Sequence, residues 1–298
     1  MTRPTRDTTT GRVYLDLRRK ARTEARATDE LLVLYVLERF LYRLSISPYR
    51  DRFVLKGGML LAAFDERRPT RDVDLLGLAV TNDAETVTAL VAEITAIEVD
   101  DGVTFRRDQV TTQVIREQDA YAAVRVAMPA SVATAELALK VDVNVGDPVT
   151  PAPIEVTYPA LLDEPFTMVG YPLATVLAEK LVTMISRGDT TTRDRDYADV
   201  WLLASRHRID ASALRDAIVA TAEHRDVTLV RLSDVLSTLA TDRQDGWRRY
   251  ITRTGLDTDV PATLAEVIAD VTAFVDPVLD DVLDARASWD PAARRWLT

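Results

Sequence analysis

The sequence predicts an α+β protein in which an N-terminal mixed β-sheet with flanking helices is followed by an all-α region. Between residues 103 and 145, several runs rich in β-branched residues alternate apolar and polar positions, which is typical of strands. After residue 159, the apolar residues recur at helical spacing instead. With 298 residues, of which 47% are hydrophobic, the chain is long enough to bury one large core or two smaller ones.

The N-terminal segment is expected to change from a disordered tail to helices. Residues 1–10 are rich in Thr, Arg and Asp, and we expect them to be disordered. Helices over residues 14–26 and 29–44 should follow, because apolar residues such as Leu34 and Leu41 form an approximate helical stripe in the second of them.

Strands and helices then alternate around a glycine pair and an aspartate pair. Two successive glycines mark a tight turn after a strand-forming run, and a polar dipeptide before an apolar stretch marks a helix start. The expected elements are a strand over residues 53–55, a helix over 59–64, a strand around residue 72, a helix over 81–97, and strands beginning at residues 103, 111, 121 and 135, the last reaching residue 145.

A proline-rich connection at residues 148–159 separates the two regions, and nearly everything after it is expected to be helical. We therefore predict an α/β domain over residues 11–165 and a helical domain over residues 166–298 that completes a cleft. The sequence contains no internal repeat and no low-complexity tract.

The composition excludes several classes of function. The chain has no cysteine, so disulfides, thiolate metal sites and a cysteine nucleophile are excluded, and a reducing cytoplasm is the expected compartment. His207 and His224 belong to no ligand-spaced cluster and are more simply interpreted as surface or helix-end residues. No run approaches the ~20 apolar residues of a membrane span, and the N-terminus lacks the apolar segment of a signal peptide, so no membrane partner is expected.

Positive charge is concentrated at the N-terminal end of the chain. The net charge is −10, yet residues 1–56 carry 13 Lys and Arg against 7 Asp and Glu. Such asymmetry indicates contact with a polyanion, although a solvated helix face with ion pairs explains it equally well. The densest group of basic residues is Arg18, Arg19, Lys20, Arg22 and Arg26.

Asp72 and Asp74 are the first candidates for chemistry. Residues two apart in a strand point to the same face, about 6.5 Å apart along the chain, so both carboxylates should project together while Val73 faces the other way. At roughly 5 Å and an effective dielectric near 20, the two charges repel by about 3 kcal/mol, a cost that a divalent cation removes. Carboxylate oxygens suit Mg²⁺ or Mn²⁺. An Asp-x-Asp taken alone also fits a solvated strand edge.

Gly57 and Gly58 strengthen the functional interpretation of the aspartate pair. Because glycine lacks a Cβ, its backbone N–H group can approach a phosphate closely. A glycine pair followed at this spacing by two carboxylates is how nucleotidyltransferases present a nucleoside triphosphate (NTP) and its metals to an acceptor. We therefore expect an enzyme.

A third carboxylate is expected from the last strand of the sheet. There, Asp142 and Asn144 should share one face, with Val141 on the other. An acid delivered from a neighbouring strand would complete a two-metal site and favour deprotonation of an attacking hydroxyl. Asp147 is a competitor, but it lies in a turn beyond the strand, where an acid more often caps or faces solvent.

Lys180 is the candidate contact for a triphosphate. Its neighbours at helical spacing include Leu177 and Met184, so its ammonium should rise from a largely apolar helix face. Snorkelling of the side chain to the surface is the simpler alternative. If Lys180 serves a triphosphate, its replacement by alanine should leave stability unchanged or improved, because a partly buried charge would be removed.

Asp196 opens a helix after a run of alternating charges and begins the inward side of that helix. We expect it to orient Lys180 or Arg187. Capping of the helix is the simpler alternative for this residue.

These motifs resemble the AbiEii/AbiGii nucleotidyltransferase toxin family, a branch of the DNA polymerase β-like superfamily. The pattern departs mildly at Thr70, where many members have serine, and at Gly58, where the wider superfamily often has serine. In order and spacing the resemblance covers residues 53–203. It is carried by Phe53-Val-Leu-Lys-Gly-Gly-Met-Leu-Leu, Arg68-Pro-Thr-Arg-Asp-Val-Asp-Leu-Leu, Leu139-Lys-Val-Asp-Val, Glu179-Lys180-Leu, Arg187 and residues 193–199.

The resemblance implies a nucleotidyltransferase-type sheet and the toxin of a bacterial toxin–antitoxin pair, with a cognate antitoxin and, in some cases, a role in phage defence. Characterised relatives add nucleotides to RNA, notably the 3′ end of tRNA, and thereby block translation. The implied metal ligands for Mg²⁺ or Mn²⁺ are Asp72, Asp74 and Asp142. The implied NTP contacts are Gly57, Gly58, Thr70, Lys180 and Arg187, with Asp196 orienting the basic groups.

Three alternatives remain open. A metal-dependent glycosyltransferase also uses Asp-x-Asp, for a nucleotide-sugar, but would not explain the glycine pair or Lys180. A phosphatase of the haloacid-dehalogenase type uses Asp-x-Asp-x-Thr, but Leu76 stands where its threonine should be. A non-catalytic RNA- or protein-binding module on the same fold would bind NTP without turnover. The NTP used, the RNA acceptor and the oligomeric state do not follow from the sequence.

Overall fold

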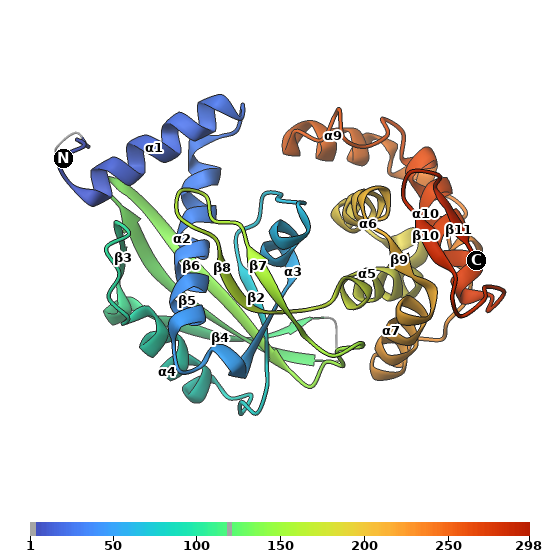
Figure 1. Cartoon of the computed structure of the whole chain (residues 1–298), viewed down its shortest axis with the longest axis horizontal. Coiled ribbons are helices and arrows are strands. Elements are labelled where there is room, and N and C mark those ends of the chain that lie inside the picture. Colours follow the sequence, from blue (N-terminus) through green and yellow to red (C-terminus); the bar gives the residue numbers. More distant parts are fainter. Residues whose placement is uncertain (1–3, 118–120) are drawn as a thin grey trace. The chain divides into compact units, whose positions relative to one another are not determined.

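The structure is a computed structural model that describes residues 4–117 and 121–298, and it confirms the α+β class (Figure 1). Contacts within the chain divide it into two compact units, which we call the sheet unit and the helical unit. The sheet unit comprises Met1–Gly146 and Ile154–Gly170, and the helical unit comprises Asp147–Pro153 and Tyr171–Thr298. The domain boundary at residue 165 stays a prediction.

The sheet unit is built around one mixed β-sheet. Its strands are β1 (Phe53–Lys56), β2 (Val73–Gly77), β3 (Val103–Phe105), β4 (Thr111–Glu117), β5 (Tyr121–Val132), β6 (Ala135–Val145), β7 (Ile154–Tyr158) and β8 (Phe166–Gly170). Among the described residues these eight strands follow the order β3-β5-β6-β2-β1-β8-β7, with β4 also paired to β5. β2 is parallel to β6 and β1 is parallel to β8, whereas the other neighbours are antiparallel.

An apolar row crosses the centre of this sheet and forms part of its core. The row consists of Leu55, Leu75, Val143 and Val124, which are paired in register across β1, β2, β6 and β5 and are at most 1% exposed. Two helices cover the sheet: α2 (Thr28–Ile46) packs against β6 and β8, and α4 (Ala84–Thr95) packs against β4 and β5 (Figure 1). Burying each such side chain stabilises the unit by about 1.5–3 kcal/mol, which fixes the register of the central strands.

Two helices of the sheet unit, α1 (Thr9–Thr23) and α4, begin where polar side chains cap them. Helix α1 starts earlier than predicted because the Thr8 hydroxyl accepts a hydrogen bond from the backbone N–H of Gly11. The prediction of disorder therefore fails for Thr9 and Thr10, and residues 1–3 lie outside the described part of the chain. Asp83 caps α4 in the same way, by accepting from the backbone N–H of Thr86 at 2.8 Å. The predicted helix over residues 59–64 appears as α3 (Gly57–Leu60) and a 3-10 helix (Leu61–Phe64).

Strands β7 and β8 contradict the prediction that a proline-rich connection leads directly into helices. Pro153 and Pro159 flank β7 rather than interrupt it, and proline is tolerated at strand ends. β7 pairs with β8, and β8 adjoins β1 through the register pair Leu55 and Gly170. The sheet therefore extends beyond the predicted strands on this side.

The helical unit contains six α-helices in the described chain: α5 (Leu173–Arg187), α6 (Asp194–Arg206), α7 (Ala211–His224), α8 (Leu239–Asp242), α9 (Gln244–Thr254) and α10 (Leu264–Leu279). It also contains a small antiparallel sheet, so the all-α expectation was wrong there. Its strands are β9 (Ile209–Asp210), β10 (Ser288–Asp290) and β11 (Arg295–Leu297). Large aromatic rings hold these short strands: Trp289 and Trp296 pack on Phe274, and the Trp289 indole donates to the Ala204 carbonyl at 2.7 Å.

None of the helices in residues 4–117 and 121–298 combines the length and the apolar composition that crossing a membrane requires.

Candidate active site

Four charged residues stand side by side across the central strands of the sheet unit, and we call them the charged row. The register pairs Lys56 of β1 with Asp74 of β2, Asp74 with Asp142 of β6, and Asp142 with Arg125 of β5. Residues directly opposite in neighbouring strands share a face, so these side chains lie on the face opposite to the apolar row. The structure thus brings Asp142 beside Asp74, from a neighbouring strand, as the sequence indicated.

Asp72 precedes β2 and adjoins the charged row through Arg125. Both Asp142 carboxylate oxygens accept hydrogen bonds from Arg125, from Nε at 2.7 Å and from Nη2 at 2.5 Å. The same Nη2 lies 3.7 Å from Oδ2 of Asp72. One guanidinium is therefore in contact with two of the three predicted carboxylates.

Arg125 is the residue of this site that the sequence did not predict. The hydrogen bond from Arg125 to Asp142 raises the pKa of the guanidinium above its ordinary value despite partial burial, and the negative charges of Asp72 and Asp74 act in the same direction. A single charged residue in the apolar run of β5 could have marked Arg125 as a candidate site residue. Its contact with Asp142, however, follows from the pairing of β5 with β6, which the sequence does not show.

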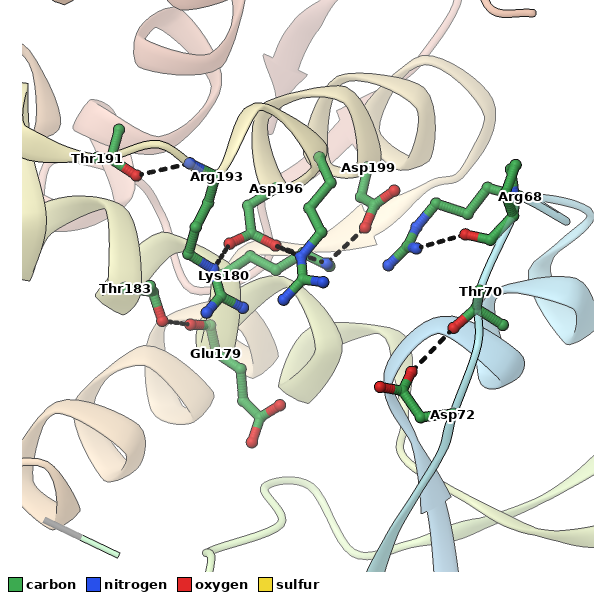
Figure 2. Close-up of polar contacts among 12 residues, drawn as sticks. Arg68, Thr70, Asp72, Glu179, Lys180, Thr183, Thr191, Arg193, Asp196 and Asp199 are labelled. Carbon is green, nitrogen blue, oxygen red and sulfur yellow. Dashed lines mark hydrogen bonds and ion pairs between the residues drawn. The ribbon is translucent and has the colours of Figure 1, made fainter. Parts of the chain in front are cut away.

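The two glycines make room for the polar side chains of the site. Gly57 has a φ of +64°, which favours glycine, and a Cβ there would lie 1.9 Å from Oδ2 of Asp74. A Cβ at Gly58 would lie 2.7 Å from the hydroxyl oxygen of Thr70. That hydroxyl donates to Oδ1 of Asp72 at 3.2 Å (Figure 2). The glycine pair thus determines where Asp74 and Thr70 can lie, while its contact with phosphate stays a prediction.

The three carboxylates have the chemistry to hold a divalent cation, but their side chains are not gathered around a common point. Within the described ranges, no group of three or more His, Cys, Asp or Glu side chains is placed to hold a metal ion. At this site, both oxygens of Asp142 are engaged by Arg125. Asp72, Asp74 and Asp142 would hold Mg²⁺ or Mn²⁺ if the guanidinium moved away, since carboxylate oxygens are the ligands these ions prefer.

In the helical unit, Lys180 ends on two buried carboxylates. Its Nζ lies 3.2 Å from Oδ1 of Asp196 and 2.6 Å from Oδ2 of Asp199 (Figure 2). The side chain of Lys180 is 14% exposed, and those of Asp196 and Asp199 are 3% and 2% exposed. The snorkelling alternative is therefore wrong, because the ammonium points into the unit. With Arg193, these residues form what we call the lysine cluster.

Asp196 connects the two basic residues of the lysine cluster. It accepts a hydrogen bond from Nε of Arg193 at 2.6 Å in addition to its contact with Lys180. Burial raises the pKa of Asp196, but the positive charges of Lys180 and Arg193 outweigh that effect and hold the pKa at about 2. The structure thus brings Asp196 to Lys180, one of its two predicted partners.

Arg187, the other predicted partner, ends helix α5. Its Nε is buried and has no hydrogen-bond partner among the residues that the structure describes. Asp147, the competitor for the third carboxylate, belongs to the helical unit and lies 3.5 Å from Nε2 of His224. Asp147 is therefore not part of the charged row.

Comparison with known proteins identifies the class to which this arrangement belongs. The sequence model of the nucleotidyl transferase AbiEii toxin, from type IV toxin–antitoxin systems, matches residues 39–285. The chain therefore belongs to the AbiEii nucleotidyltransferase toxin family, and the resemblance inferred from its motifs is confirmed. Membership implies an NTP substrate, an antitoxin partner and, in most members, a divalent metal.

A solved structure shows the same fold, and a second is similar over much of the chain. MenT4, a nucleotidyltransferase toxin from Mycobacterium tuberculosis H37Rv, is similar over 91% of this chain and 90% of its own, with a TM-score of 0.59 and 20% identity. JHP933 from Helicobacter pylori is similar over 86% of this chain and 94% of its own, with a TM-score of 0.48 and 14% identity. No curated protein matches the sequence. The comparison with MenT4 supports the fold of an α+β protein with a largely helical C-terminal region.

Proposed function

We propose that the protein transfers nucleotides from an NTP to an RNA acceptor, the 3′ end of tRNA, and thereby blocks translation and growth. The observation that carries the proposal is the charged row, in which Asp74 and Asp142 lie in register on adjacent strands, with Asp72 next to the arginine that binds Asp142. Membership of the nucleotidyltransferase toxin family supplies the class of reaction.

In the proposed reaction, the 3′-hydroxyl of the acceptor attacks the α-phosphorus of the NTP. The bond from that phosphorus to the bridging oxygen breaks, and pyrophosphate leaves. Asp72, Asp74 and Asp142 would hold the metal, and Asp142 would also favour removal of the hydroxyl proton. When bound, Mg²⁺ or Mn²⁺ neutralises phosphate charge and lowers the pKa of the hydroxyl. Positioning and charge stabilisation supply most of the acceleration in such transfers.

Each unit, taken by itself, contains candidate contacts for phosphate. In the sheet unit, Gly57, Gly58 and Thr70 contact phosphate beside the carboxylates. In the helical unit, Lys180 binds the triphosphate tail, and Arg187 contributes a second positive charge. An ammonium has three donors, and Asp196 and Asp199 accept two of them, which leaves one for a phosphate oxygen.

The positive charge on the outer face of α1 supports the proposal that the acceptor is RNA. The inner side of this helix is buried and includes Val13, Leu17 and Ala21. At helical spacing, the opposite side carries Arg12, Arg18, Arg19 and Arg22. In the described chain, a carboxylate partner is recorded only for Arg19 among these four, namely Asp16 at 3.1 Å. Arginines without carboxylate partners on one helix face are suited to the phosphates of a nucleic acid. Lys20, by contrast, forms an ion pair with Glu24, as the alternative interpretation of the basic segment expects.

The family implies an antitoxin, and we propose that it silences this transfer reaction until the toxin is needed, for example in phage defence.

The proposal is tested by incubating the protein with each labelled NTP, Mg²⁺ and total RNA, followed by gel separation and 3′-end sequencing. We expect label in the tRNA fraction and extended tRNA 3′ ends. Transfer from a labelled nucleotide-sugar instead would show a glycosyltransferase. Binding of NTP without any transfer would favour the non-catalytic module on the same fold.

A further inference from the structure

Arg125 reaches the carboxylates from a strand with buried neighbours, but its own side chain is partly exposed. Its neighbours Val124 and Val126 are buried, and both are paired in register with β6. The side chain of Arg125 is 33% exposed, whereas that of Asp142 is 11% exposed. The guanidinium can therefore leave the charged row by rotation of the side chain alone, without any change in the sheet.

A divalent cation and this guanidinium require the same oxygens. Both oxygens of Asp142 accept hydrogen bonds from Arg125, and the nearer oxygen of Asp72 lies 3.7 Å from the same guanidinium. A metal bound to Asp142 needs at least one of these oxygens as a ligand. A dication and a guanidinium also repel each other at such distances, so each weakens the binding of the other to these oxygens.

We propose that Arg125 is the counter-cation of the metal-free site, that metal binding displaces its guanidinium from Asp142, and that this competition sets the metal affinity of the charged row. The inference rests on the proposed function only in taking the row as the metal site. Arg125 is then a positioning residue, which holds Asp142 and Asp72 close together until the metal replaces it.

The first consequence concerns metal affinity in the absence of NTP and RNA. Mn²⁺ binding is measured by the loss of the free-ion electron paramagnetic resonance signal. Removing the competitor in Arg125→Gln should tighten Mn²⁺ binding at least tenfold, which corresponds to about 1.4 kcal/mol. Arg125→Lys keeps the charge but loses the paired contact, so its affinity should lie between the two. Arg106→Gln is the matched control, because Arg106 pairs with exposed Glu136 on the same sheet and should leave Mn²⁺ binding unchanged.

The second consequence separates competition from a structural role. Without metal, Arg125→Gln should melt at a lower temperature than the wild type, because the carboxylates lose a counter-cation. Saturating Mn²⁺ should close that gap, since the metal then stabilises the same oxygens in both proteins. A purely structural arginine would leave the gap unchanged.

The outcomes distinguish this inference from the proposed function. If wild type and Arg125→Gln bind Mn²⁺ equally and Asp74→Asn abolishes binding in both, the role of Arg125 is overturned while the metal site stands. If Asp74→Asn changes Mn²⁺ binding in neither protein, the metal row itself is refuted. Should Arg125→Gln fail to fold, Arg125→Lys decides: an affinity equal to that of the wild type overturns the competition.

Discussion

The charged row of the sheet unit and the lysine cluster of the helical unit use the same types of residue but differ in charge balance. In the lysine cluster, Asp196 and Asp199 face Lys180 and Arg193, and Nε of Arg195 also lies 4.0 Å from Oδ1 of Asp196. In the charged row, Lys56 and Arg125 stand beside Asp74 and Asp142, and Asp72 adds a third carboxylate next to Arg125. The cluster is also more deeply buried. A buried group whose carboxylates are matched by cations holds a fold together, whereas a partly exposed group of three carboxylates can accept a further cation.

The largest expected effect would come from breaking the balance of the lysine cluster. Lys180→Met keeps the length of the side chain but leaves Asp196 and Asp199 buried without the ammonium, and removal of one partner of a buried pair costs about 3–5 kcal/mol. This corrects the expectation that loss of Lys180 leaves stability unchanged or improved. Denaturant unfolding followed by circular dichroism measures it.

Lys20→Met is the control for this variant, because Lys20 pairs with the partly exposed Glu24 on α1, and such pairs contribute about 0–1 kcal/mol. A Lys180→Met protein as stable as Lys20→Met would contradict the view that the cluster is a structural group.

The second effect concerns the surplus charge of the row. Asp74→Asn removes one carboxylate and should reduce nucleotide transfer at least ~10²-fold, in line with the loss of a charge-stabilising group. The melting temperature should stay the same or rise, because repulsion among the carboxylates decreases. Initial rates and calorimetry measure the two quantities. Glu136→Gln, on the exposed part of β6, should change neither; retained transfer by Asp74→Asn would remove Asp74 from the site.

A smaller effect, on RNA binding, is expected from changes on the outer face of α1, where positive charge is in surplus. Reversing Arg12, Arg18 and Arg22 to Glu should lower RNA affinity and flatten its salt dependence by about one unit of slope per lost phosphate contact. Filter binding over a range of salt concentrations measures this. Arg248→Glu, an exposed change on α9, is the control. If the slope matches that of the wild type, these arginines form a solvated surface.

The smallest expected effect is a pH dependence of stability, which differs between buried carboxylates because their pKa values shift in opposite directions. Burial raises the pKa of Glu38 on α2 to about 7, although Arg39 and Arg67 oppose the shift. Its contribution to the free energy of unfolding is therefore full below the unfolded value of 4.5 and is lost as pH rises through about 7. For Asp196, the contribution is present above 3.8 and is lost as pH falls through about 2.

Urea unfolding of wild type and Glu38→Gln between pH 4.5 and 7.5 tests the assignment for Glu38. The stability of the wild type relative to the variant should decrease as pH rises over this range. A constant difference between the two proteins would show that Glu38 does not change its protonation on unfolding.

Much of the sheet unit was predictable because local patterns and tertiary packing agree there. The strands at residues 103, 111, 121 and 135 were predicted from alternation and the strand at residue 53 from an apolar run before the glycine pair, and the structure contains all of them. The prediction failed for β7, where flanking prolines obscured a strand, for β8, which was expected to be helical, and for β9 to β11, which are too short for alternation to be visible. Packing of Trp289 and Trp296 on Phe274 holds β10 and β11 together, and a local pattern contains no such information.

The site was predictable where its residues are close in sequence. Asp72, Asp74 and the glycine pair lie within one segment, so their spacing was informative. Arg125 meets Asp142 because both stand at the same distance from the turn that joins β5 to β6. That turn contains Ala133 at a φ of +53° and lacks the Asn-Gly or Asp-Gly pair that usually marks a two-residue hairpin. The register was therefore not visible in the sequence.

The aromatic packing of the helical unit also gives the protein a built-in optical reporter. All four tryptophans, Trp201, Trp247, Trp289 and Trp296, belong to the helical unit, and the sheet unit contains none. Fluorescence excited at the red edge of indole absorption therefore reports the unfolding of one unit only, while circular dichroism reports both. Emission from Lys180→Met should change at lower denaturant than emission from the wild type, and emission from Arg125→Gln should not. A single spectroscopic titration can thus assign each loss of stability to its own half of the chain.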